Sequence, residues 1–107
     1  MIKRISLVWK RPELSEATFR ALWLGAHADF VRKLPGLREY VIDFRIEGPS
    51  EAPDGIATVR FDTREELDAA FATPGLRDDL IRTRNAFAER VEVLFVEEAT
   101  MVGVQVE

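Results

Sequence analysis

The sequence predicts an α+β fold with the element order β-α-β-β-α-β. Three features carry this prediction: four segments with alternating apolar residues, two helical segments that each follow a capping residue, and a Pro-Gly pair that ends or interrupts each helical segment. No Pro- or Gly-rich linker divides the 107 residues. We therefore expect a single domain spanning residues 1–107.

The first strand is expected over residues 2–9, because Ile5, Leu7 and Trp9 alternate with other residues. Pro12 cannot continue a paired strand, and Ser15 is placed to cap a helix over about 16–33. On a helical wheel, an arc of roughly 120° holds the apolar residues. This stripe consists of Phe19, Leu22, Trp23, Ala26, Phe30 and Leu34.

The second and third strands are expected over residues 38–46 and 56–61. Tyr40, Ile42, Phe44 and Ile46 share one face of residues 38–46. Between the two strands, residues 47–55 form a polar loop with two prolines and two glycines.

Thr63 and Glu66 form a capping box that opens a helix through about Ala72. After Pro74-Gly75, a second helical piece is expected over 76–88, followed by a fourth strand over 90–98. In the tail, the alternating Val102, Val104 and Val106 suggest a short fifth strand.

Two β-α-β halves in this order are typical of the ferredoxin-like split β-α-β fold, an antiparallel sheet with both helices on one face. The first and fourth strands carry apolar side chains on both of their faces, so the face without helices is also apolar. Such a surface indicates a partner, and we expect a homodimer of face-to-face sheets. The alternative is that these residues fill the core of a monomer.

Composition, charge and the motifs that are missing argue against several classes of function. The net charge of −4 and the absence of a basic patch argue against nucleic acid and anionic membranes as partners. The chain has no cysteine, no signal peptide and no apolar run of the ~18 residues that a membrane span needs. With a single histidine and no phosphate-binding loop, we expect neither a metal site nor a cofactor, and a cytoplasmic location.

The single histidine, His27, lies at the shoulder of the apolar stripe, about 80° from Phe19 on a regular helix. At that position, a group that titrates near neutrality can act as a general acid or base on a bound organic molecule. Asp29, Arg38 and Asp43 are candidate partners. The alternative is that His27 is a half-buried structural residue, hydrogen-bonded to a carbonyl.

Aromatic side chains near this helix can line a pocket for a ring-shaped ligand. The alternative is that they form the core of a small domain. Together with one basic residue, the candidate substrate-binding residues are Trp9, Trp23, Phe30, Arg38 and Tyr40.

The segment from Phe19 to Tyr40 resembles the EthD-like family of the dimeric α+β barrel superfamily. The matching positions are Phe19, Arg20, Trp23, His27, Ala28, Pro35, Gly36, Leu37 and Tyr40, with Asp54-Gly55 at the start of the third strand and Phe95-Val96-Glu97-Glu98 near the end. The resemblance implies a homodimer whose sheets pack into a barrel. In relatives that use acid–base chemistry, the histidine of the first helix is the usual candidate, which carries over to His27.

Three functions follow as hypotheses. The first is a cofactor-independent isomerase or dehydratase that acts on a cyclic or aromatic molecule in a catabolic or polyketide-tailoring pathway, with His27 as general acid or base. The second is a cofactor-free monooxygenase. The third is a non-catalytic ligand-binding accessory protein.

Overall fold

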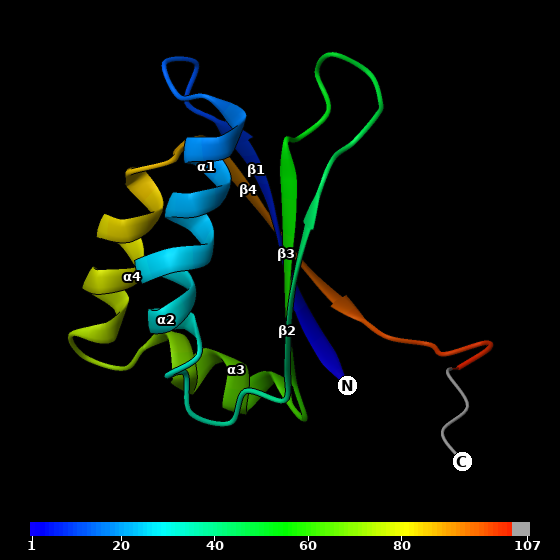
Figure 1. Cartoon of the computed structure of the whole chain (residues 1–107). Coiled ribbons are helices and arrows are strands. Elements are labelled where there is room, and N and C mark those ends of the chain that lie inside the picture. The colour runs from blue at the N-terminus through cyan, green and yellow to red at the C-terminus, as the bar shows by residue number, and fades with distance from the viewer. Residues whose placement is uncertain (104–107) are drawn as a thin grey trace.

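A computed structural model describes residues 1–103 of the chain. Its sheet contains β1 (Ile2–Lys10), β2 (Glu39–Phe44), β3 (Gly55–Phe61) and β4 (Ala88–Glu97) in the spatial order β2-β3-β1-β4. Every neighbouring pair is antiparallel, and the helices cover one face (Figure 1). The ferredoxin-like α+β fold is thereby confirmed.

The predicted fifth strand is not seen where it can be assessed. Residues 101–103 are exposed and form no strand, while Val104 and Val106 lie outside the described residues. β1 occupies an interior position in the sheet, so both of its edges are paired, with β3 and with β4.

The first helical segment has three parts: α1 (Glu16–Leu22), the π-helical turn η1 (Trp23–His27) and α2 (Ala28–Val31). The Ser15 hydroxyl caps α1 by accepting a hydrogen bond from the Thr18 amide at 3.1 Å, as predicted. In η1, Gly25 departs from helical geometry with φ −86° and ψ −119°, and the Ala28 amide bonds back to the Trp23 carbonyl five residues earlier.

This π turn changes which residues face the sheet. Of the predicted stripe, Ala26 is exposed, as is Leu22 before the turn, whereas Ala28 and Val31, which lie outside the stripe, are buried. One inserted residue rotates everything after it by ~100° on an α-helical wheel. His27 therefore takes the inward position that a regular helix would have given to Ala26.

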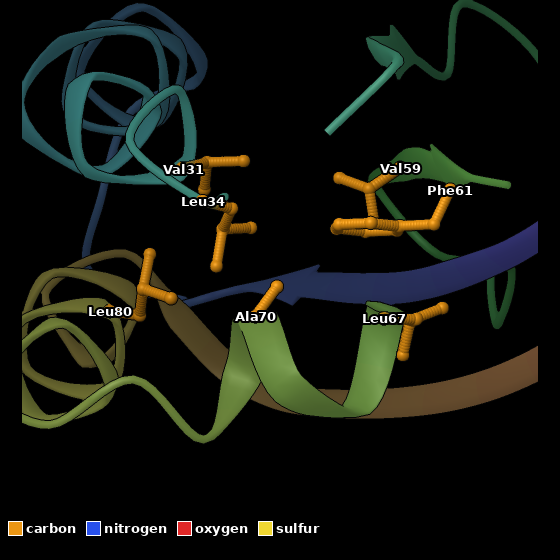
Figure 2. Packing of buried hydrophobic residues seen from close by; sticks show 7 residues of the cluster. All are labelled: Val31, Leu34, Val59, Phe61, Leu67, Ala70 and Leu80. Atoms are coloured by element: carbon orange, nitrogen blue, oxygen red, sulfur yellow. The ribbon is translucent and has the colours of Figure 1, made fainter. Parts of the chain in front are cut away.

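Two further helices, α3 (Arg64–Phe71) and α4 (Leu76–Asn85), complete the layer. Thr63 caps α3 as predicted, since its hydroxyl accepts from the Glu66 amide at 3.1 Å. One core cluster joins these helices to β3 and the end of the first helical segment (Figure 2). It contains Val31, Leu34, Val59, Phe61, Leu67, Ala70 and Leu80.

A second core cluster is aromatic and lies nearer the start of the first helical segment. The Trp23 and Phe87 rings stack with centroids 5.2 Å apart, and both contact Phe19 edge-on. Trp23, Phe19 and Phe87 are almost completely buried. Because this cluster ties α1 and η1 to the segment before β4, it fixes the position of the π turn over the sheet.

Strand register separates the two faces of the sheet. Arg4, Ser6 and Val8 of β1 point toward the helices, beside Phe95, Val93 and Val91 of β4. The opposite face, which we call the open face, carries the other parity of each strand. Its apolar residues are Ile5, Leu7, Trp9, Val41, Ile56, Leu94 and Val96.

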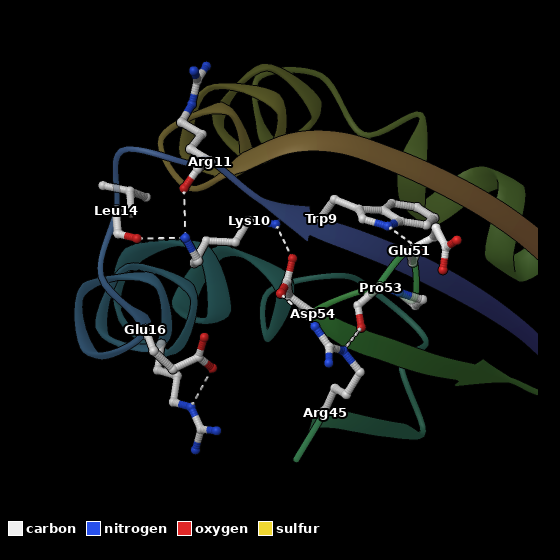
Figure 3. A network of polar contacts seen from close by, with 10 residues as sticks. Trp9, Lys10, Arg11, Leu14, Glu16, Arg45, Glu51, Pro53 and Asp54 are labelled. Carbon is white, nitrogen blue, oxygen red and sulfur yellow. Dashed lines mark hydrogen bonds and ion pairs between the residues drawn. The ribbon is translucent and has the colours of Figure 1, made fainter. Parts of the chain in front are cut away.

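The loop between β2 and β3 is held by polar contacts that centre on Asp54 (Figure 3). Its carboxylate accepts from the Lys10 amide at 2.8 Å and from Arg45 Nη2 at 3.2 Å. The Asp54 amide donates to the Val8 carbonyl at 2.8 Å. These bonds set the start of β3 at Gly55, directly under the Trp23 ring.

Gly55 should not tolerate a side chain. A Cβ at this position would lie 2.3 Å from Trp23 Cζ3, and the indole is almost completely buried. We expect Gly55→Ala to lower the free energy of unfolding by ~1–3 kcal/mol through overpacking, measured by urea denaturation. Gly103→Ala, at an exposed position, should leave the free energy unchanged, and equal effects of the two changes would contradict the close contact.

Candidate active site

A cavity of about 420 Å³ lies between the helices and the sheet. Its walls come from all four strands on one side and from η1, α2, α3 and α4 on the other. Phe95 and Ile81 are exposed members of the lining, so the cavity opens between α4 and β4. A volume in this range is ordinary for a small-molecule site.

His27 is half-buried in the cavity wall, with its ring edge-on to Phe87 at a centroid distance of 5.3 Å. Its Nδ1 lies 2.8 Å from the Thr83 hydroxyl. The shortest contact of that hydroxyl is to the Asp79 carbonyl at 2.7 Å, with the Leu80 carbonyl at 3.3 Å, and assigning its hydrogen to Asp79 makes it the acceptor from His27. Nδ1 therefore carries the proton, and Nε2 holds the lone pair.

The His27 ring is neutral at pH 7. Burial, together with the charges of Arg84 and Arg4, lowers the pKa of His27 from 6.5 to about 4. The nearby Leu80 carbonyl opposes this shift. No hydrogen bond involves Nε2 within residues 1–103. The nitrogen that remains available is thus an unprotonated base.

Tyr40 adds a second polar group to the lining. Its hydroxyl oxygen is buried and has no hydrogen-bond partner among the described residues. Burial raises the pKa of the Tyr40 hydroxyl to about 12, against the opposing effect of the Trp23 side chain. A buried hydroxyl without a partner is costly.

The structure brings together three of the residues predicted from sequence. His27, Trp23 and Tyr40 all line the cavity. Asp29, considered as a partner of His27, pairs with Arg32 instead, at 2.6 Å. Asp43 has the opposite strand parity to Tyr40 and therefore lies on the open face.

Trp9, Phe30 and Arg38 do not reach the cavity. Trp9 lies on the open face because of its strand parity, where its indole donates to the Glu51 carbonyl at 2.9 Å. Phe30 packs against the core cluster that contains Val31 and Leu34, because the π turn rotates it away from the cavity. Arg38 is exposed and pairs with Asp62 at 2.8 Å.

Four residues that sequence reasoning missed complete the site: Arg4, Thr83, Arg84 and Phe87. Leu80, Thr83, Arg84 and Phe87 have the i, i+3, i+4, i+7 spacing of one helix face, which is a usable signal. Arg4 lies on the face of β1 that points toward the helices. A charged residue on a helix-covered strand face is unusual, and that anomaly could have identified it.

No group of three or more His, Cys, Asp or Glu residues that could hold a metal ion occurs within residues 1–103. In the same part of the chain, no helix has both the length and the apolar character needed to cross a membrane.

A family model described as the EthD domain matches residues 11–90 of the chain. This segment contains His27, Trp23, Tyr40 and the whole of α4. None of the curated proteins has a significantly similar sequence.

Solved structures share the fold. An EthD family protein from Bacillus halodurans C-125 superposes with a TM-score of 0.77 at 24% identity, covering 92% of this chain and 99% of that one. A dimeric ferredoxin-like protein of unknown function from Thermobifida fusca YX gives 0.70 at 14% identity, with 89% and 88% covered. SnoaB, a cofactor-independent oxygenase from Streptomyces nogalater, gives 0.68 at 12% identity, with 94% and 95% covered. At these identities the likeness establishes the fold alone.

The depressed pKa of His27 should make stability depend on pH. Between pH 6.5 and about 4, the unfolded chain protonates this residue while the folded chain does not. The free energy of unfolding should therefore fall as the pH is lowered through this window, with about 2 kcal/mol of the decrease due to His27. Urea denaturation at pH 7 and pH 4.5 would measure the decrease. His27→Gln should lack this component, and an equal decrease in both proteins would contradict the assignment.

Proposed function

The chain belongs to the EthD domain family, and we propose that it is an enzyme that binds a cyclic or aromatic small molecule in the cavity and uses His27 as a general base. The observation that carries this proposal is the fixed, neutral imidazole. Thr83 holds Nδ1–H at 2.8 Å and leaves Nε2 without a partner in a largely apolar cavity. A base needs this combination of orientation and protonation state.

The proposed chemistry is proton transfer that leads to isomerisation or dehydration. Nε2 accepts a proton from a carbon next to a carbonyl, and the imidazolium returns it. Return to a different atom of the same molecule gives an isomer, whereas protonation of a departing hydroxide gives a dehydrated product and water. The low pKa of free His27 favours this return, since the imidazolium is a strong acid.

Trp23, Phe87 and Tyr40 support the choice of ligand class. The first two present aromatic surface close to His27, which suits a ring. Tyr40 offers an unpartnered hydroxyl that can donate to a carbonyl oxygen. These residues would orient the ligand, and none of the proposed steps requires a cofactor.

A second candidate function is a cofactor-free monooxygenase. It is favoured by the shared fold with SnoaB, a cofactor-independent oxygenase, and by an apolar cavity able to hold an electron-rich aromatic molecule. The two candidates differ in the product, because an oxygenase adds an oxygen atom and consumes molecular oxygen.

We further propose that the chain is a homodimer through the open face. Leu94 and Val41 are 51% and 40% exposed on that face, and contiguous apolar patches of this kind usually mark interfaces. Ferredoxin-like proteins from Bacteroides fragilis and Thermobifida fusca are described as dimeric. A second copy that presents the same face would satisfy two-fold symmetry.

Mass spectrometry of lactones and hydroxy-aromatic compounds incubated with the protein tests the catalytic proposal. An isomerase gives a new peak of unchanged mass, a dehydratase gives loss of water, and an oxygenase gives gain of oxygen. His27→Gln should reduce the rate at least ~100-fold because it removes the base.

Asp29→Asn is the matched control, since Asp29 lies two residues from His27 and pairs only with Arg32. It should retain the wild-type rate. Conversion by His27→Gln at the wild-type rate would remove His27 from the mechanism, and the absence of any conversion with tight ligand binding would favour an accessory protein.

Leu94→Glu should convert the dimer to a monomer, because it replaces an exposed apolar side chain of the open face with a charge. Light scattering after size-exclusion chromatography would give the molar mass. Ile46→Glu, at a 95% exposed loop position, should remain dimeric. A wild-type protein with the mass of one chain, or a dimeric Leu94→Glu, would refute the open-face interface.

A further inference from the structure

Two arginines that the proposed proton transfer does not use also line the cavity. Arg4 projects from β1 and donates to the Ser6 hydroxyl at 3.0 Å, and its guanidinium carbon lies 4.4 Å above the Phe71 ring. Arg84 projects from α4, and its one side-chain contact is a long one of 3.4 Å to the Asn85 amide oxygen. Within residues 1–103, neither guanidinium has a carboxylate partner.

The cavity contains almost no negative charge to balance them. Its one acidic lining residue is Asp68, which pairs with Arg64 at 2.9 Å. A third arginine, Arg77, lies at the exposed rim. This pocket is therefore locally positive in a chain with a net charge of −4.

The two charges lie close enough to affect each other. Burial lowers the pKa of Arg4, and the charge of Arg84 lowers it further. Two half-buried cations without a counterion are held at a free-energy cost. An anion between them would offset that cost, and a carboxylate matches the planar guanidinium fork.

We propose that the ligand of this cavity is a cyclic or aromatic carboxylate, whose anionic group is bound by Arg4 and Arg84 beside His27. This inference rests on the proposed function and narrows its substrate class. The carboxylate would neutralise the two cations, and Tyr40 would remain free to bind a second oxygen of the ligand.

A bound carboxylate would also make His27 more basic. The two guanidinium groups oppose protonation of the imidazole, and an anion between them cancels that effect. Binding of the carboxylate would therefore raise the basicity of His27 in the complex in which the proton transfer takes place. Neutral analogues would fill the cavity without this activation.

The test compares 2-naphthoate with its neutral isostere 2-naphthamide, by titration calorimetry and by tryptophan fluorescence. The wild-type protein should bind the carboxylate at least ~10-fold more tightly than the amide, as expected for charge-assisted hydrogen bonds. Arg4→Gln and Arg84→Gln should each lose most of this preference while their affinity for the amide is unchanged.

Arg82→Gln is the matched control, because Arg82 lies on the same helix, outside the cavity, and pairs with Asp79 at 3.0 Å. It should keep the preference, which shows that total charge is not the cause. Equal affinity for the two probes, or a preference that survives in both cavity variants, would overturn the anion site and leave the ligand cavity intact. Failure of both probes to bind would count against the anion site and the proposed function together.

Discussion

The π turn at residues 23–27 is the constraint on which the site depends. A regular helix from residue 16 would place Ala26 toward the sheet and His27 at the edge of the apolar stripe. The extra residue in the turn, bonded from the Ala28 amide back to Trp23, rotates His27 into the cavity. Trp23 anchors the turn by packing against Phe87 and over Gly55. π turns of this kind occur frequently at functional sites.

The position of His27 then determines its chemistry. Facing inward, the imidazole meets Thr83 on α4, which orients it, and burial together with two nearby guanidinium groups keeps it unprotonated. The same burial that makes the residue a neutral base makes it costly to charge. A ligand that brings its own negative charge would remove part of this cost, so recognition and catalysis would depend on the same electrostatic balance.

The fold could be predicted from the sequence, whereas the site could be predicted only in part. Alternating strands, the caps at Ser15 and Thr63, and the Pro-Gly pairs are local signals, and the structure confirms the elements that they predict. The π turn has no comparable signal, so the helical wheel placed Ala26 inward and left Ala28 and Val31 outside the stripe. Arg4 on β1 and Arg84 on α4 line one cavity only because of the tertiary fold, which composition and spacing do not encode.

The most direct test of this account is an NMR titration of the single histidine. Because the chain contains no other histidine, its imidazole carbon and nitrogen resonances can be assigned without ambiguity. The account predicts the Nδ1–H tautomer at pH 7 and a pKa for His27 of about 4, with the tautomer lost in Thr83→Val. A pKa near 6.5 together with an Nε2–H tautomer would contradict the buried, oriented base at the centre of the account.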